Sequence, residues 1–151
     1  MKTLKIEIPS GFEIAEFDTK TGVVSFKETP KDIKQRIKTF ADVLNYFGID
    51  EDDFEDGNET LEPDEVAYRK VKLIVNALNE EWKPDWTNSS QTKYFPWFKM
   101  GSSSGSGFSF HDYDNWLSNS TVGSRLCFKS RELAEYAGKQ FTEIYKEFMT
   151  I

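Results

Sequence analysis

The stretch KYFPWFKMGSSSGSGFSFHDYDNW, residues 93–116, places two aromatic segments on either side of a loop made of glycine and serine. Alternate side chains of a strand point to opposite faces, and residues 94–100 are apolar on both. We predict a β-hairpin with strands near 94–100 and 107–113, joined by a mobile loop over 101–107. One face carries Tyr94, Pro96, Phe98 and Met100, and the other carries Phe95 and Trp97.

A strand that is apolar on both faces is either buried on both or exposes aromatic rings. Pro96 has no N–H group to donate to a sheet, which favours an edge strand. We expect Tyr94, Phe95, Trp97 and Phe108 to lie mostly in the core, with a partly exposed rim. The alternative is that some of these rings form a recognition surface.

Two further helices and one further strand are predicted around this hairpin. Apolar residues recur at helical spacing over 63–82, which is the clearest element of the chain. Downstream, residues 125–130 favour a strand, and Ser130 is a predicted N-cap for a helix over 131–148. Upstream of residue 60, the acidic run DEDDFEDGNET (50–60) predicts a solvated loop.

The N-terminal part alternates between apolar and charged residues. This period predicts strands over 4–8, 12–17 and 22–28, arranged as a small meander. Helical spacing follows over 29–48, with two candidate starts: Thr29 followed by Pro30, or Thr39 paired with Asp42. The chain is therefore predicted to be one α+β domain over 1–151, with an antiparallel sheet of about 5–6 strands in two sequence blocks and about three packed helices.

Composition narrows the functional classes. The chain has 26 acidic and 19 basic residues and a formal charge of −7, without a basic run. Phosphate backbones are bound by clustered lysine and arginine, so nucleic acid is an unfavourable partner. The start of the chain has no signal-peptide pattern and no segment reaches the roughly 20 apolar residues of a membrane span. With one cysteine, Cys127, the chain suits a reducing compartment, and we expect a cytoplasmic protein with no membrane partner.

Two groups of residues were candidates for metal binding or catalysis. Placing Gly57 at the sixth position of a calcium loop puts Phe54 and Pro63 where oxygen ligands are needed, so that motif fails. His111, Asp112 and Asp114 could serve a hydrolase, but this is the only histidine and no spacing completes a site. We predict no metal, no cofactor and no catalytic residue.

Cys127 is the remaining reactive side chain. If its neighbours face the core, Cys127 shares the opposite face with Arg125 and Lys129, whose charges would lower its pKa. A nucleophile also requires a base, and His111 is the only imidazole. An incidental small residue is the favoured interpretation.

Several blocks of the chain together are similar to a known group of proteins. AYRKVKLIVNALNEEWKPDW, KYFPWF and VGSRLCFKSRELAEYAGKQFTEIYKEF resemble a family of small proteins encoded by bacteriophages and prophages of gut bacteria. The resemblance spans nearly the whole chain and includes IEIPSGFEI and FADVLNYFGI. The family has no assigned activity, so the resemblance implies a phage-related origin in a bacterial cytosol and no functional residue.

These observations predict a non-enzymatic domain that binds another protein, as an adaptor, a particle component or a modulator of a host factor. The alternative is binding of nucleotides or single-stranded nucleic acid through the aromatic hairpin 94–113, with rings stacking on bases. Trp97 is the expected anchor of the binding surface. The predicted binding residues are Tyr94, Trp97, Lys99, Tyr113 and Arg125.

Overall fold

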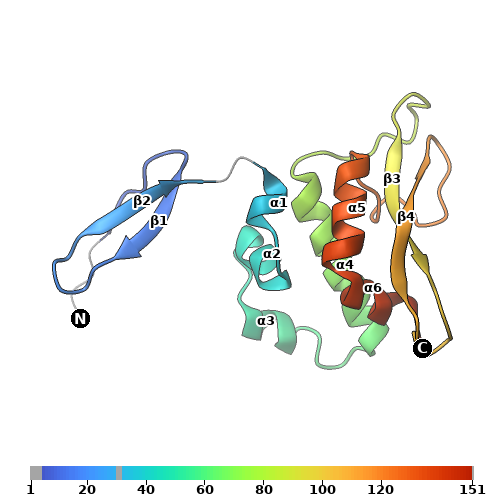
Figure 1. The fold of residues 1–151 in the computed structure, drawn as a ribbon, viewed down its shortest axis with the longest axis horizontal. Helices are drawn as coiled ribbons and strands as arrows, with labels where there is room; N and C mark the ends of the chain where they lie inside the picture. Colours follow the sequence, from blue (N-terminus) through green and yellow to red (C-terminus); the bar gives the residue numbers. More distant parts are fainter. Residues whose placement is uncertain (1–4, 30–31, 151) are drawn as a thin grey trace.

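The computed structural model of the chain describes residues 5–29 and 32–150. Figure 1 shows an N-terminal hairpin that lies apart from the helices, and a second hairpin with helices on one side of it. The α+β class is confirmed. The described strands, however, form two separate antiparallel sheets of two strands each, rather than one sheet of about 5–6 strands.

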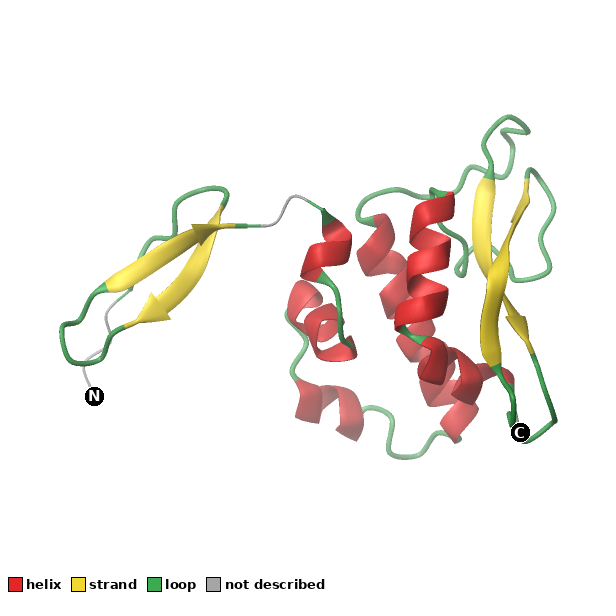
Figure 2. Cartoon of the chain, viewed as in Figure 1, coloured by secondary structure: helices red, strands yellow, loops and turns green. Residues whose placement is uncertain are grey.

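The helices and strands have the following bounds. The strands are β1 (Phe12–Phe17), β2 (Val24–Glu28), β3 (Lys93–Lys99) and β4 (Ser109–Trp116). The helices are α1 (Ile33–Arg36), α2 (Phe40–Phe47), α3 (Glu51–Asp56), α4 (Pro63–Asn79), α5 (Arg131–Gln140) and α6 (Thr142–Met149). Figure 2 shows the helices gathered between the two hairpins.

The first hairpin is closed by a turn built on Asp18. Its carboxylate accepts hydrogen bonds from the Thr21 hydroxyl at 2.6 Å and from the Lys20 amide at 2.8 Å, which holds the pKa of Asp18 below its usual value. Gly22 takes a φ of +73°, which glycine adopts without steric cost. The predicted third strand is not formed: residues 5–8 have no strand partner, and residue 4 lies outside the described residues.

The helical region begins with two short helices whose caps are visible in the sequence. Thr39 and Asp42 form the expected capping box of α2, and Gly48 ends that helix with a φ of +66°. The other predicted start was Thr29 followed by Pro30, and Pro30 lies outside the described residues. The cap of α1 is instead Asp32, whose side chain accepts a hydrogen bond from the Lys34 amide.

The acidic run 50–60 is a helix over part of its length, so the loop prediction is wrong for α3. Asp50 caps this helix, with its side chain accepting from the Asp52 amide at 3.0 Å. Glu51, Asp52 and Asp53 occupy the first turn, where the positive end of the helix dipole favours negative charge.

The C-terminal helix is confirmed in position but is broken in two. Ser130 caps α5 as predicted, with its hydroxyl accepting from the Leu133 amide at 3.4 Å. Phe141 takes a ψ of +29° between α5 and α6, and its ring is buried. The predicted strand over 125–130 is reduced to one bridge, in which Tyr94 and Phe128 exchange hydrogen bonds of 3.0 and 2.7 Å.

The core lies between α4, α5, α6 and the inner side of β3–β4. Its central residues are fully covered and come from all of these elements. They include Val71, Ile74, Leu78, Phe98, Phe128, Leu133, Ala137, Phe141 and Tyr145.

Gly138 sets the distance between α5 and the sheet. A Cβ atom at this position would overlap the ring of Phe110 and lie 2.8 Å from the Cβ of Pro96. Gly138→Ala gains about 1 kcal/mol of helix propensity, but overpacking typically costs about 1–3 kcal/mol. The difference is a net loss of up to about 2 kcal/mol in the free energy of unfolding, measured by urea titration. Asn76→Ala, at an exposed site on α4, is the control and is expected to be neutral; a stabilised Gly138→Ala would contradict this packing.

Candidate functional site

The hairpin β3–β4 presents two faces with different surroundings. Cross-strand partners share a face, and the register pairs Trp97 with Asp112, Phe95 with Asp114, and Pro96 with Tyr113. We call the side that packs on the helices the inner face, and the side of Phe95, Trp97, Asp112, Asp114 and Trp116 the outer face. Figure 1 shows α5 and α6 on one side of this hairpin only.

The inner face is a packed aromatic layer. The ring of Phe98 lies 4.9 Å from those of both Phe108 and Tyr145, measured between centroids. Tyr94 and Tyr113 are 5.9 Å apart, and the Arg131 guanidinium lies 4.8 Å from the Tyr113 ring centre. This face therefore stabilises the domain.

The outer face is partly open to solvent. Phe95 is buried beneath Trp116, whose ring stacks on it at 6.3 Å. Trp97 keeps 50% of its surface exposed, although Pro96 and Phe98 on either side are buried. Trp116 is also exposed on this face, so two exposed rings, those of Trp97 and Trp116, lie on either side of the buried Phe95; Leu117, which follows β4, is exposed as well.

The predicted binding residues do not form one site. Trp97 and Lys99 lie on the outer face, with both side chains exposed. Tyr94 and Tyr113 meet on the inner face and are half-buried. Arg125 is exposed in the segment between β4 and α5. Of the four rings expected to lie mostly in the core, Phe95 is buried, and Tyr94 and Phe108 are half-buried. Trp97 is exposed, so the expectation is wrong for this residue.

The Gly/Ser loop has a defined set of hydrogen bonds. The Ser102 amide donates to the Ser106 carbonyl at 3.0 Å, and the Gly105 amide donates back to Ser102 at 2.9 Å. Gly105 is buried, and a Cβ atom there would lie 2.6 Å from Lys146 of α6. The loop thus packs against α6.

His111 and its two neighbouring carboxylates are arranged by a β-bulge. The register shifts between Trp97 and Phe98, which leaves His111 outside the regular pairing. Asp112 and Asp114 each accept a hydrogen bond from the following backbone amide, at 2.8 and 2.7 Å. Over residues 5–29 and 32–150, no three His, Cys, Asp or Glu side chains come together as a metal site would require.

Cys127 differs from the expectation of a lowered pKa. It is 1% exposed, and burial raises the pKa of its thiol to about 11. The side chain thus lies in the interior instead of sharing an exposed face with Arg125 and Lys129. At neutral pH Cys127 is a protonated thiol, which is unreactive as a nucleophile.

Lys93 is a buried cation with a structural role. It is 0% exposed, and its Nζ atom donates to the carbonyls of Asp85 at 2.5 Å and Asn88 at 3.2 Å. The Trp86 ring centre lies 5.2 Å from the same atom. Lys93 therefore anchors the segment between α4 and β3. The register places Lys93 on the same side of the hairpin as Trp116, but its charge is buried against this segment.

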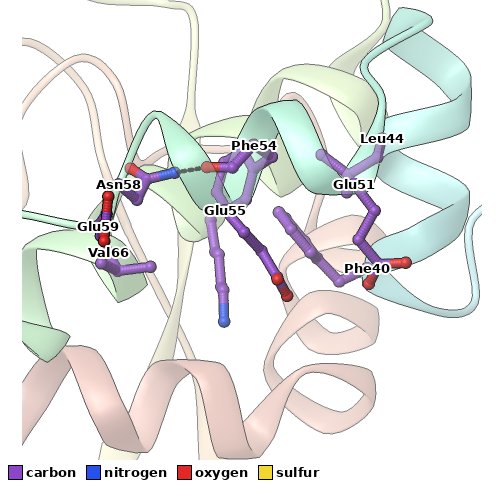
Figure 3. Close-up of a pocket in the computed structure, with 9 residues that line it drawn as sticks. Phe40, Leu44, Glu51, Phe54, Glu55, Asn58, Glu59 and Val66 are labelled. Atoms are coloured by element: carbon purple, nitrogen blue, oxygen red, sulfur yellow. Dashed lines mark hydrogen bonds between the residues drawn. The ribbon is translucent and has the colours of Figure 1, made fainter.

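A concave pocket lies between α2, α3 and α4. Figure 3 shows the rings of Phe40 and Phe54 in this pocket, with Glu51 and Glu55 beside them. The pocket has a volume of about 270 Å³, and the Lys70 Nζ atom lies 5.7 Å from the centre of the Phe40 ring. Lys70 itself therefore supplies the positive charge beside the Phe40 ring and the carboxylates of this pocket. This pocket could not be predicted from the sequence, because α3 was expected to be a loop.

The hairpin β1–β2 carries a second exposed apolar surface, which the sequence pattern predicted to be buried. Its alternating residues predicted a strand with one face in the core, but Phe12, Ile14 and Phe17 are exposed. The alternation indicates that the hairpin has an apolar face, but it does not indicate which surface covers that face.

Comparison of the chain with protein-family models, with curated proteins and with solved structures finds no match. Among the described residues, no helix has the length and apolar composition needed to cross a bilayer.

Proposed function

We propose that the chain is a non-enzymatic protein-binding domain that contacts its partner through the outer face of β3–β4. The observation that carries the proposal is the position of Trp97. Its neighbours along the strand are buried, so the strand is fixed in place, while the indole is 50% exposed. A large ring on a strand that is already ordered requires little further ordering of the backbone on binding, which favours an interface anchor.

The surroundings of Trp97 support a protein as the partner. Trp116, 37% exposed, adds a second exposed ring to this face, and Leu117, just after the end of β4, is 48% exposed. Aromatic residues are enriched in the centres of protein interfaces, where polar residues form the rim. The paired Asp112 and the neighbouring Asp114 supply such a rim. Their negative charge favours a partner segment that combines apolar side chains with lysine or arginine.

The same surroundings are less suited to the alternative, single-stranded nucleic acid. Base stacking on Trp97 would bring phosphates close to the carboxylates of Asp112 and Asp114, which repel them. Two of the cations that this function needs are engaged elsewhere. Lys93 is buried against backbone carbonyls, and Lys129 forms an ion pair with Glu80 at 2.8 Å.

The biological setting is proposed from the resemblance to phage and prophage proteins. A protein of this kind acts in the cytoplasm of a bacterial host, as an adaptor, a particle component or a modulator of a host factor. We propose no catalytic activity, because His111, Asp112 and Asp114 lie along one exposed strand and are not gathered in a cleft with a nucleophile.

Trp97→Ala tests the proposed function. The folded domain is used to capture partners from a lysate of a gut bacterium, and the captured proteins are quantified by mass spectrometry. We expect the variant to lose its partner by about 30-fold or more, since aromatic anchors contribute about 2 kcal/mol or more. Phe47→Ala removes an exposed ring from α2 and is the matched control, which should retain every partner.

A parallel titration with a labelled oligothymidine separates the two functions. We expect no binding at physiological salt. Oligothymidine binding that Trp97→Ala abolishes would favour the nucleic-acid alternative, and full retention of protein partners by Trp97→Ala would place the binding surface elsewhere.

A further inference from the structure

The hairpin β1–β2 has one wholly apolar face at its centre. The register pairs Ile14 with Phe26 and Phe17 with Val24, and a bulge at residue 15 returns Phe17 to the side of Ile14. At the end of this face, Phe12 is paired with Glu28. We call this surface the apolar face; its members are Phe12, Ile14, Phe17, Val24 and Phe26.

The opposite face of the hairpin is polar and is turned toward the helices. Glu13 and Lys27 form an ion pair there at 3.0 Å. These two side chains line a shallow groove together with Gln35 and Asp42 of the α1–α2 region. Because the polar face is directed to the rest of the chain, the apolar face points away from it.

The exposure of the apolar face is unusual for a folded domain. Phe12, Ile14 and Phe17 are 40%, 46% and 56% exposed. An isolated two-stranded hairpin is at best marginally stable in water, and strands usually need a third strand or a packed layer to persist. A hairpin of this pattern therefore requires a cover that is present whenever the protein is folded.

We propose that the cover is the apolar face of a second copy of the chain. A second copy is available wherever the chain is made. Aromatic side chains bury about 150–250 Å² when fully covered, so three apolar side chains that are 40–56% exposed and two that are less exposed offer on the order of 400 Å² per copy. Two copies together bury about 800 Å² of these side chains, which is the size of a weak, reversible interface.

The geometry of the hairpin suits such a pair. Two sheets pack face to face when their inner side chains interdigitate, which here gives a sandwich of two strands on two strands. The same patch on both copies makes a two-fold interface, the commonest symmetry among oligomers. Glu28, the charged residue on this side of the hairpin, lies at its end, so closing the sandwich does not require a charge to be buried at its centre. The Glu13–Lys27 pair remains in solvent.

Sedimentation velocity of the full chain tests the proposal. An interface of this small size predicts a reversible dimer, with dimer fraction rising between about 1 and 100 μM. Phe26→Glu places a charge at the centre of the apolar face and should leave only monomer over this range. Ser25→Glu adds the same charge one residue away on the polar face and should leave the dimer unchanged. Near-ultraviolet circular dichroism checks that the core of each variant remains folded.

Two results would overturn the proposal. One is a wild-type monomer up to the highest concentration, which would mean that another partner or the chain's own body covers the face. The other is a dimer that survives Phe26→Glu, which would place the interface elsewhere. Trp97→Ala should leave the dimer intact, so failure of this inference is distinguishable from failure of the function proposed for the outer face.

Discussion

Replacing Leu78 with alanine is expected to lower the free energy of unfolding by about 2–5 kcal/mol, the range for truncating a buried leucine. Leu78 lies on α4, is 0% exposed and belongs to the cluster between α4, α5 and α6. The loss combines the removed apolar contacts with the cavity that remains. Urea titration followed by circular dichroism should show a clearly lower midpoint with an unchanged slope.

Leu117→Ala is the matched control for this prediction. Leu117 undergoes the same chemical change but is 48% exposed, just after the end of β4. Its substitution should alter stability by less than about 0.5 kcal/mol, as is usual for surface sites. Equal losses for the two leucines would mean that α4 is not the centre of the core.

The helices that pack the core could be predicted because their apolar period is long. Helix α4 carries a buried stripe over its whole length, and the capping residues Thr39 and Ser130 use short-range hydrogen bonds that depend only on neighbouring residues. The break at Phe141 could not be predicted in this way. The apolar spacing continues through it from Ala137 to Tyr145, so the sequence pattern resembles one unbroken helix.

The four strands of the two hairpins were predicted near their observed positions, but the strands expected over 4–8 and 125–130 are not formed as predicted in the described residues, and the expected single sheet is wrong. Alternation reports that a hairpin has an apolar face, not which surface covers it. For β1–β2, the apolar face is exposed in the single chain. The acidic α3 was missed for a related reason: a run of carboxylates resembles a solvated loop unless the cap at Asp50 is given weight.

The sequence pointed to Trp97 as the anchor of the candidate site, but it did not show which other residues share its face. Trp97 and Tyr94 differ by an odd number of residues along one strand, so they must face opposite sides. Which side is buried depends on Gly138, because the missing side chain lets α5 approach Pro96 and Phe110. That contact joins Gly138 to residues 42 and 28 positions earlier in the chain, and no local pattern reports it. The burial of Lys93 could not be predicted for the same reason, since it depends on backbone carbonyls in the segment before β3.

The second large effect is expected at Asn79, where α4 is tied to the segment before α5. Asn79 is 3% exposed; its Nδ2 atom donates to the Cys127 carbonyl at 2.8 Å, and its Oδ1 atom accepts from the Lys129 amide at 2.9 Å. These bonds hold residues 127–129 in position, including Phe128, which bridges to Tyr94 of β3. Asn79→Ala removes both bonds at once. The buried Cys127 carbonyl then loses its Asn79 donor, and the partly buried Lys129 amide loses its Asn79 acceptor.

Leaving a buried polar group unsatisfied costs about 1–3 kcal/mol, so Asn79→Ala should lower the free energy of unfolding by about 2–4 kcal/mol in urea titration. Asn76→Ala makes the same substitution at an exposed site on the same helix and should be neutral or slightly stabilising, because alanine has the higher helix propensity.

Asn79→Asp keeps the acceptor for Lys129 but loses the donor to Cys127 and adds a charge near a carbonyl, so it should also destabilise the protein at neutral pH. Its loss should diminish as the pH falls and the carboxyl is protonated, because a carboxylic acid regains one donor. A stability of Asn79→Ala equal to that of Asn76→Ala would show that the link between α4 and β3 rests on apolar packing alone.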